Sequence, residues 1–248
     1  MPASAELDAL GVDAVELAAA VELMSSLPDA TASQAVRFLR ATKGDVASAK
    51  TFLAQHLTWR ENTLPISLES ASPELFRLKF TPLGRMPDGS YVMLIRSRLL
   101  GKHTYDSMDE AKQGVLYILE HLEQHVLAPL EKVVVLFSRI DSSRENFDLP
   151  WIKAMGGLLQ ANYPERLKCV VVAPVPFIMR GVWETVKPFL DPVTRDKVSL
   201  HADAAGAFLD IVPAHLLPEE LGGQSTVPLS IDEWIHPPTA AAPHHAQH

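Results

Sequence analysis

Residues 162–201 read NYPERLKCVVVAPVPFIMRGVWETVKPFLDPVTRDKVSLH. Cys169–Ala173 and Val198–His201 are short runs of strand-forming residues, and Phe177–Phe189 between them has the apolar spacing of a helix. A strand, a helix and a second strand in this order are typical of a mostly parallel or mixed sheet that is covered by helices. This stretch therefore predicts an α/β fold.

The residues upstream repeat this alternation. Further strands are predicted at Phe76–Phe80, Tyr91–Arg96 and Val133–Phe137. Pro87, Asp88 and Gly89 are turn residues and predict a hairpin between the first two of these strands. Helices are predicted at Ser107–Val126, which has apolar residues on one face, and at Asp148–Asn162. We expect these helices to cover the sheet.

A small helical unit is predicted at the start of the chain, because apolar residues recur every three or four positions in residues 12–64 and glycine is scarce there. Its helices are expected at Asp13–Leu27, at Thr31–Thr42 and from Asp45 onward. The Ser, Glu and Pro residues of Ile66–Pro73 predict an exposed connection. We therefore divide the chain into an N-terminal helical subdomain (1–70), an α/β domain (71–235) and a disordered tail (236–248).

The composition argues against several classes of protein. A formal net charge of −8 disfavours a nucleic-acid partner, which needs a surplus of clustered basic residues. Cys169 is the only cysteine and the acidic start of the chain lacks a targeting signal, so we expect a reducing, cytoplasmic location. The longest apolar run, Cys169–Met179, has about half the length of a membrane helix and contains two prolines. No segment is therefore expected to span a bilayer.

The sequence lacks the main enzyme motifs: G-x-S-x-G, H-E-x-x-H, G-x-x-x-x-G-K-[ST] and G-x-G-x-x-G do not occur. We therefore expect no enzymatic activity and no cofactor. Ser138, His201 and Asp203 could be combined into a catalytic triad, so a hydrolase stays an alternative. The histidines of the tail cannot fix a coordination geometry on a flexible segment, so no metal site is expected.

Five ordered runs along the chain carry a resemblance to a known family. They are Arg37–Ala41 and Trp59–Arg60 in the helical unit, and Asn162–Leu167, Lys187–Thr194 and Leu217–Gly223 in the α/β domain. Together they resemble the CRAL-TRIO lipid-binding domain, in particular the yeast-type phosphatidylinositol-transfer protein family, over Thr31–Trp234. The resemblance implies a helical N-terminal unit beside an α/β domain, whose sheet floors an acyl-chain pocket closed by a helical gate.

The family's gate helix aligns with Phe177–Phe189. Its polar residues Arg180, Glu184 and Lys187 form one narrow stripe, and the rest of its circumference is largely apolar. One apolar face could line the pocket while another meets a membrane; the alternative is a helix buried on two sides of an ordinary core. The predicted gate residues are Phe177, Ile178, Val182, Trp183, Val186 and Phe189.

The resemblance maps the family's inositol-phosphate site onto Lys43, Glu165, Thr194 and Lys197. The two lysines can donate to a phosphate, the threonine adds a hydroxyl, and the glutamate can accept from ring hydroxyls. The alternative is a structural ion pair between Glu165 and Lys197 and a solvated helix end at Lys43.

Two positions depart from a family member that also holds phosphatidylcholine. That member uses a Ser and a Thr on a central strand, where this chain has Val133 and Val135. Neither valine can hydrogen-bond a phosphate. A sterol, another apolar molecule or a different phospholipid therefore remain open as the second ligand.

The resemblance implies a monomeric cytoplasmic protein that binds one phospholipid, phosphatidylinositol, and exchanges it during transient contact with membranes. Burying about 30 methylenes is favourable by on the order of 20 kcal/mol relative to water, but a bilayer offers nearly the same. Selectivity must therefore come from the headgroup. The alternatives are a carrier of another hydrophobic ligand, sterol or tocopherol-like, and a lipid-sensing regulatory adaptor.

Overall fold

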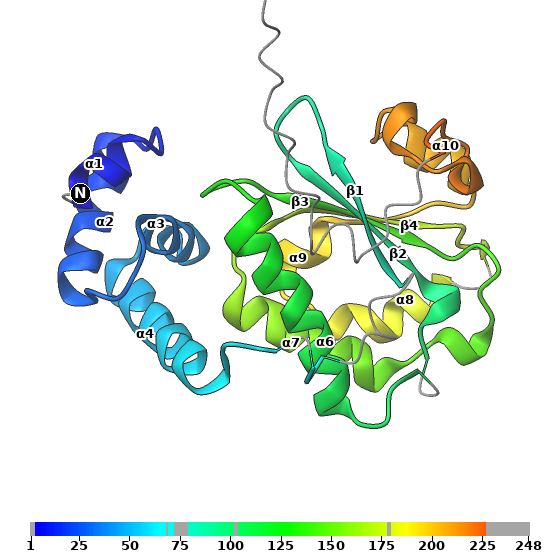
Figure 1. Ribbon diagram of the computed structural model, residues 1–248, viewed down its shortest axis with the longest axis horizontal. Coiled ribbons are helices and arrows are strands. Elements are labelled where there is room, and N and C mark those ends of the chain that lie inside the picture. The colour runs from blue at the N-terminus through cyan, green and yellow to red at the C-terminus, as the bar shows by residue number, and fades with distance from the viewer. Residues whose placement is uncertain (1–2, 68, 72–78, 102–103, 178–179, 227–248) are drawn as a thin grey trace, which may run out of the picture.

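The computed structural model describes residues 3–67, 69–71, 79–101, 104–177 and 180–226. The predicted tail lies outside these residues. The described part of the chain forms a helical unit beside an α/β domain, and the two meet along one side of the domain (Figure 1).

The helical unit contains the three predicted helices and one that was not predicted. Its elements are α1 (Ala3–Asp8), α2 (Ala14–Ser26), α3 (Ala32–Ala41) and α4 (Val46–Thr63). Asp13, Thr31 and Asp45 are the N-caps of α2, α3 and α4, and each accepts hydrogen bonds from the first turn of its helix. The predicted helices are therefore confirmed nearly to the residue. Leu7 of α1 is fully buried in the core of the unit.

The α/β domain is built on one five-stranded sheet. Its strands are β1 (Phe80–Arg85), β2 (Tyr91–Arg96), β3 (Val133–Ser138), β4 (Leu167–Ala173) and β5 (Val198–Leu200), in the spatial order of the chain. The pair β1–β2 is antiparallel and the three other pairs are parallel. The predicted mixed, mostly parallel sheet is confirmed.

The end predicted for the first strand is wrong, because β1 continues to Arg85. The described strand begins at Phe80, where the predicted Phe76–Phe80 ends, and residues 76–78 lie outside the described part of the chain. The segment was missed because it contains Pro82 and Gly84, which are rare inside strands. They are tolerated at this edge of the sheet, where a bulge between them interrupts the pairing with β2.

Helices cover both faces of the sheet (Figure 1). One face is covered by α6 (Met108–His121), which continues as a π-helical turn, η3 (Leu122–Val126), by α7 (Leu149–Asn162) and by α8 (Arg180–Val186). The other face is covered by α10 (Ala204–Leu209). The remaining short elements are α9 (Pro192–Asp196), η1 (Ser97–Leu99), η4 (Arg144–Asn146), η6 (Lys187–Phe189), η7 (Ala214–Leu216) and η8 (Glu219–Leu221).

The two faces of the sheet differ in how completely they are filled. Towards α10, the side chains of Val92, Leu94, Val134, Leu136, Val171 and Ala173 are 0–1% exposed and form one core with Phe208. On the opposite face, Tyr91 and Met93 of β2 are buried in a core with α6, whereas the side chains of β3, β4 and β5 towards α8 are only half-buried. They are Val133, Val135, Phe137, Val170, Val172, Val198 and Leu200. The sheet thus has one solid face and an opposite face that keeps accessible hydrocarbon on β3, β4 and β5.

Candidate functional site

The half-buried face of β3, β4 and β5 forms the centre of the candidate site. The strand register places Val135 beside Val170, and Val172 between Phe137 and Leu200, so these side chains make one continuous surface. They carry no polar atoms. Accessible hydrocarbon costs about 25 cal/mol per Å², and a ligand that covers it recovers this free energy. We call this surface of β3, β4 and β5 the floor. It can bind an apolar molecule but has no group that could form a hydrogen bond with a ligand.

The predicted gate segment lies over this side of the domain. It forms a shorter helix than expected, α8, followed by the 3₁₀ turn η6, because Pro188 cannot continue an α-helix. Val186 is buried and Val182 and Trp183 are half-buried, whereas Phe189 is exposed. The segment thus divides its apolar side chains between the interior and solvent.

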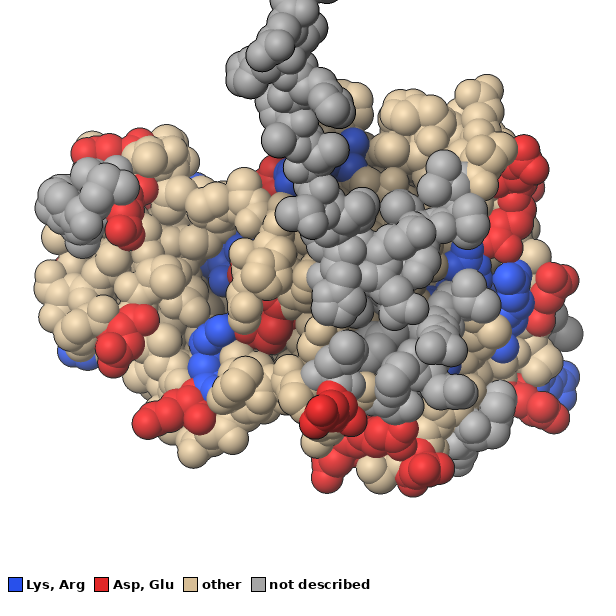
Figure 2. Space-filling view, viewed as in Figure 1, with Lys and Arg blue, Asp and Glu red and all other residues tan. Residues whose placement is uncertain are grey.

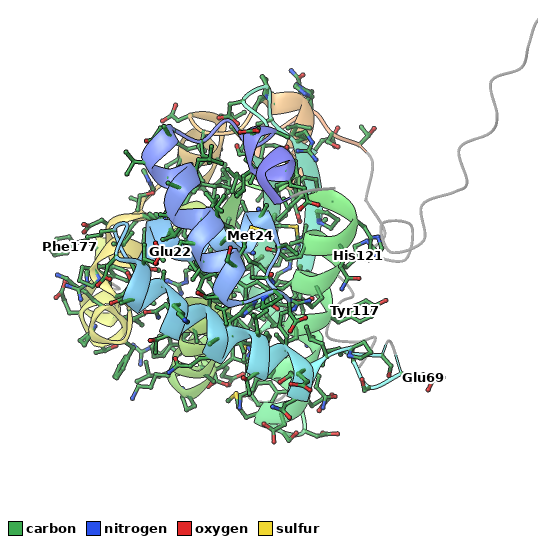
Figure 3. All side chains as sticks on the ribbon, turned by 90° about the vertical axis from the view of Figure 1, so that its left-hand side faces the viewer. Glu22, Met24, Glu69, Tyr117, His121 and Phe177 are labelled. Atoms are coloured by element: carbon green, nitrogen blue, oxygen red, sulfur yellow. The ribbon has the colours of Figure 1, made fainter. Side chains whose placement is uncertain are left out.

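Phe177 is the most exposed large apolar side chain of the described residues, with 83% of its surface accessible. It projects outward from the body of the protein (Figure 3). Ile178, another predicted gate residue, lies outside the described residues. An apolar side chain in this position is suited to a contact with a membrane, although the gate role itself stays a prediction.

The C-terminal end of the gate segment is attached to α7. Gln160 donates to the Phe189 carbonyl at 3.4 Å and accepts from the Asp191 N–H at 3.0 Å. The Lys153 ammonium lies 3.8 Å from the centre of the Phe189 ring, a cation–π contact. Any motion of α8 is therefore restrained at this end.

Of the four predicted headgroup residues, Thr194 and Lys197 lie closest together. Thr194 is in α9 and Lys197 ends it, directly before β5. The Lys197 N–H donates to the Thr194 carbonyl at 3.1 Å, and the Lys197 carbonyl accepts from the Val170 N–H of β4 at 2.8 Å. These two residues therefore sit at the amino-terminal end of β5, beside β4.

Glu165 lies in the turn before β4 and forms an ion pair with Lys132, with 3.1 Å between Nζ and Oε2. Among the ion pairs of the described residues, none joins Glu165 to Lys197, so the structural pair considered as an alternative is not formed. Lys132 was not predicted. It could have been found, because it directly precedes β3, and the parallel pairing of Val133 with Leu167 brings the starts of β3 and β4 together.

Lys43 follows α3 on the helical unit, where it is exposed and has a left-handed φ of 56°. With Arg40 and Glu16 it lines a hollow of about 390 Å³ between α2 and α3, away from the sheet. The pKa of Arg40 is raised, mainly by its hydrogen bond to Glu16, and the Glu165 carboxylate contributes. The end of α3 is thus within electrostatic reach of Glu165. The joint headgroup role of the four residues stays a prediction.

The triad considered from the sequence is not assembled. His201 Nε2 lies 2.9 Å from the Ser199 hydroxyl, whereas Asp203 caps α10 by accepting from the Gly206 N–H. Ser138 accepts from the Ile140 N–H. The three side chains therefore have separate partners.

The CRAL/TRIO domain family model matches residues 75–223, which include the whole sheet and α8. The chain belongs to the CRAL/TRIO family. This CRAL/TRIO protein is 28% identical over 204 residues to "Phosphatidylinositol transfer protein CSR1" of Eremothecium gossypii. The match covers 76% of this chain and 46% of that protein. It is 30% identical over 213 residues to the human "Alpha-tocopherol transfer protein-like", covering 81% of this chain and 60% of that protein.

The crystal structure of Sfh5 has the same fold, with a TM-score of 0.64 and 19% identity over 78% of this chain and 73% of that one. The CRAL/TRIO protein spans about half the length of the curated relatives that it matches. None of its described helices combines the length and the apolar composition that crossing a bilayer requires.

Proposed function

We propose that this CRAL/TRIO protein binds one phosphatidylinositol molecule, with the acyl chains on the apolar face of β3–β5 beneath α8, and exchanges it between membranes. The observation that carries the proposal is the contrast between the two faces of the sheet: the α10 face is filled, and the α8 face keeps accessible hydrocarbon. A relative named as a phosphatidylinositol transfer protein supports this ligand.

In this proposal the floor supplies the binding affinity for the acyl chains, and the polar and charged residues determine which headgroup is bound. A hydrocarbon surface cannot distinguish one pair of acyl chains from another by hydrogen bonds. Lys197 and Thr194 offer donors for a phosphate, and Glu165 offers an acceptor for ring hydroxyls. The protein performs no covalent chemistry in this mechanism, since binding and release alone move the lipid.

Exchange requires transient contact with the cytoplasmic face of a membrane. Three exposed apolar side chains, Phe177, Phe189 and Val193, lie on or next to the gate segment and could enter the headgroup region. Lys153 and Lys187 are beside Phe189 and are suited to anionic lipids.

The test is transfer of labelled phosphatidylinositol between liposomes. The wild-type protein should transfer it, and Lys197→Ala should slow transfer about 10-fold, the loss expected for one hydrogen bond between charged groups. Lys50→Ala, which changes an exposed lysine of α4, is the matched control and should leave transfer unchanged. Absence of transfer, or equal transfer by wild type and Lys197→Ala, would refute the proposal.

A carrier of an uncharged apolar ligand is the second candidate. Val133 and Val135 both lie on the accessible face, so the floor offers no hydroxyl to a phosphate there. A 30% identical relative is named as alpha-tocopherol transfer protein-like. Mass spectrometry of organic extracts from the purified protein separates the candidates, because only one of them predicts phosphatidylinositol as the main bound lipid.

A further inference from the structure

Charged side chains are buried where the helical unit meets the α/β domain. We call this contact the seam; it joins α3 and α4 to the end of α6, to η3 and to the turn before β4, and basic and acidic atoms are visible along it (Figure 2). Glu123 of η3 binds two guanidinium groups, one from the α/β domain and one from across the seam. Arg166 donates to both of its oxygens, at 2.5 and 2.7 Å, and Arg37 of α3 lies 3.4 Å away.

A second bridge crosses the seam beside the first. Arg60 of α4 donates to both oxygens of Glu120, at 3.0 and 2.8 Å. Glu120 also accepts from the Tyr163 hydroxyl at 2.7 Å. Burial, together with the nearby Glu120 carboxylate, raises the pKa of Tyr163, so the phenol keeps its proton and remains a donor. Each glutamate thus connects the helical unit to the segment that precedes β4.

Both bridges converge on the turn that carries Glu165. Tyr163 and Arg166, on either side of Glu165, are buried and held by Glu120 and Glu123. Arg37 Nη1 donates to the Pro164 carbonyl at 3.3 Å. Glu165 itself has a φ of 60°, in the left-handed region that is unfavourable for a non-glycine residue. The surrounding contacts must hold this conformation in place.

Arg37 is the one residue of the helical unit with a described hydrogen bond to the backbone of this turn. It is only 4% exposed, and its Nε has no hydrogen-bond partner among the described residues. Burial lowers the pKa of its guanidinium to about 10. A buried ion pair of this kind is weak evidence for stability, and in some proteins such pairs fix one specific arrangement.

We propose that Arg37 is a positioning residue for Glu165: by holding the Pro164 carbonyl and Glu123 together, it lets the helical unit set headgroup selectivity from outside the pocket. The inference rests on the proposed function, since selectivity is defined by the phosphatidylinositol that Glu165 helps to select. It gives the helical unit a role in headgroup selection, which is separate from binding of the acyl chains by the floor and from opening of the gate.

The experiment compares Arg37→Met with Arg60→Met, which removes an ion pair across the same seam but leaves the Pro164 carbonyl with its partner. Two quantities are measured: the phosphatidylinositol fraction of the lipid loaded from mixed liposomes, and amide hydrogen exchange in residues 163–167. Arg37→Met should lower the fraction about 10-fold and speed exchange in the turn. Arg60→Met should lower the fraction far less than Arg37→Met does, because the Pro164 carbonyl keeps its donor, even if both variants lower the free energy of unfolding equally.

Arg37→Lys keeps the test possible if Arg37→Met does not fold. Lysine retains the charge beside Glu123, but its single nitrogen replaces two donors, so the phosphatidylinositol fraction should fall partly. An unchanged fraction in the folded Arg37 variants, or an equal loss in Arg60→Met, would overturn the positioning role. If wild type loads no phosphatidylinositol but the turn still exchanges faster in Arg37→Met, the positioning holds and the proposed ligand is wrong.

Discussion

His56 is buried where α4 meets the end of α7, with its Nδ1 3.2 Å from the Asn162 side-chain oxygen and its Nε2 3.5 Å from the Gln34 amide. Burial lowers the pKa of His56 to about 4, and the Asn162 hydrogen bond only partly opposes this. Because the unfolded imidazole has a pKa near 6.5, the unfolded state binds more protons between these two values. The free energy of unfolding should therefore fall as the pH is lowered from about 6.5 to about 4.

Replacing His56 with Gln should remove this part of the pH dependence. Gln can still hydrogen-bond Asn162 but does not titrate. Between pH 7 and 4.5, wild type should lose on the order of 2 kcal/mol more than His56→Gln in denaturant unfolding. The exposed His215→Gln is the control and should follow wild type. Parallel curves for wild type and His56→Gln would contradict the buried, neutral histidine.

The attachment of η6 to α7 predicts how the gate segment moves. Gln160 bonds to both Phe189 and Asp191, so its side chain bridges the end of the gate to α7. Gln160→Ala removes both hydrogen bonds of this bridge, and at about 1 kcal/mol each the segment should open roughly 30-fold more often. Lipid exchange between liposomes and amide exchange in residues 186–191 should both be faster. Gln55→Ala, on the exposed side of α4, should change neither rate.

Helix starts were predictable because their signals are local. Asp13, Thr31 and Asp45 each cap a helix through a hydrogen bond to a residue two or three positions along the chain, so a short sequence contains the whole interaction. The edge strand β1 was misplaced because its pairing with β2 overrides the poor strand propensity of Pro82 and Gly84. Tertiary pairing of this kind is not visible in a short window.

The same limit applies to the candidate site, where local motifs are visible in the sequence but long-range contacts are not. The residue types of the headgroup set came from ordered motifs, but the partner of Glu165 is Lys132, 33 residues earlier in the chain. The seam was not predicted, because Arg37 and Glu123 come from distant segments and meet only when the helical unit packs against the α/β domain. Long-range charge pairs depend on the packing of whole elements, which periodicity does not specify.

The molecule as a whole has two different layers on opposite sides of one sheet. The layer beneath α10 is filled, and the layer towards α8 is accessible to a ligand. Val134 and Val135 are adjacent in β3, yet Val134 is 0% exposed in the core beneath α10, whereas Val135 is half-buried towards α8. Because neighbouring strand residues point to opposite faces, the same substitution at these two positions tests the two layers separately.

Phenylalanine at either position adds a large side chain. In the filled layer, Val134→Phe should overpack the core and lower the free energy of unfolding by about 1–3 kcal/mol. In the accessible layer, Val135→Phe should stay within about 1 kcal/mol of wild type, because the ring enters space that a ligand would occupy. It should instead lower the amount of lipid extracted per folded molecule severalfold. Equal destabilisation by both variants, with lipid content unchanged, would mean that the α8 side is as solid as the α10 side and would exclude a lipid bound on this face.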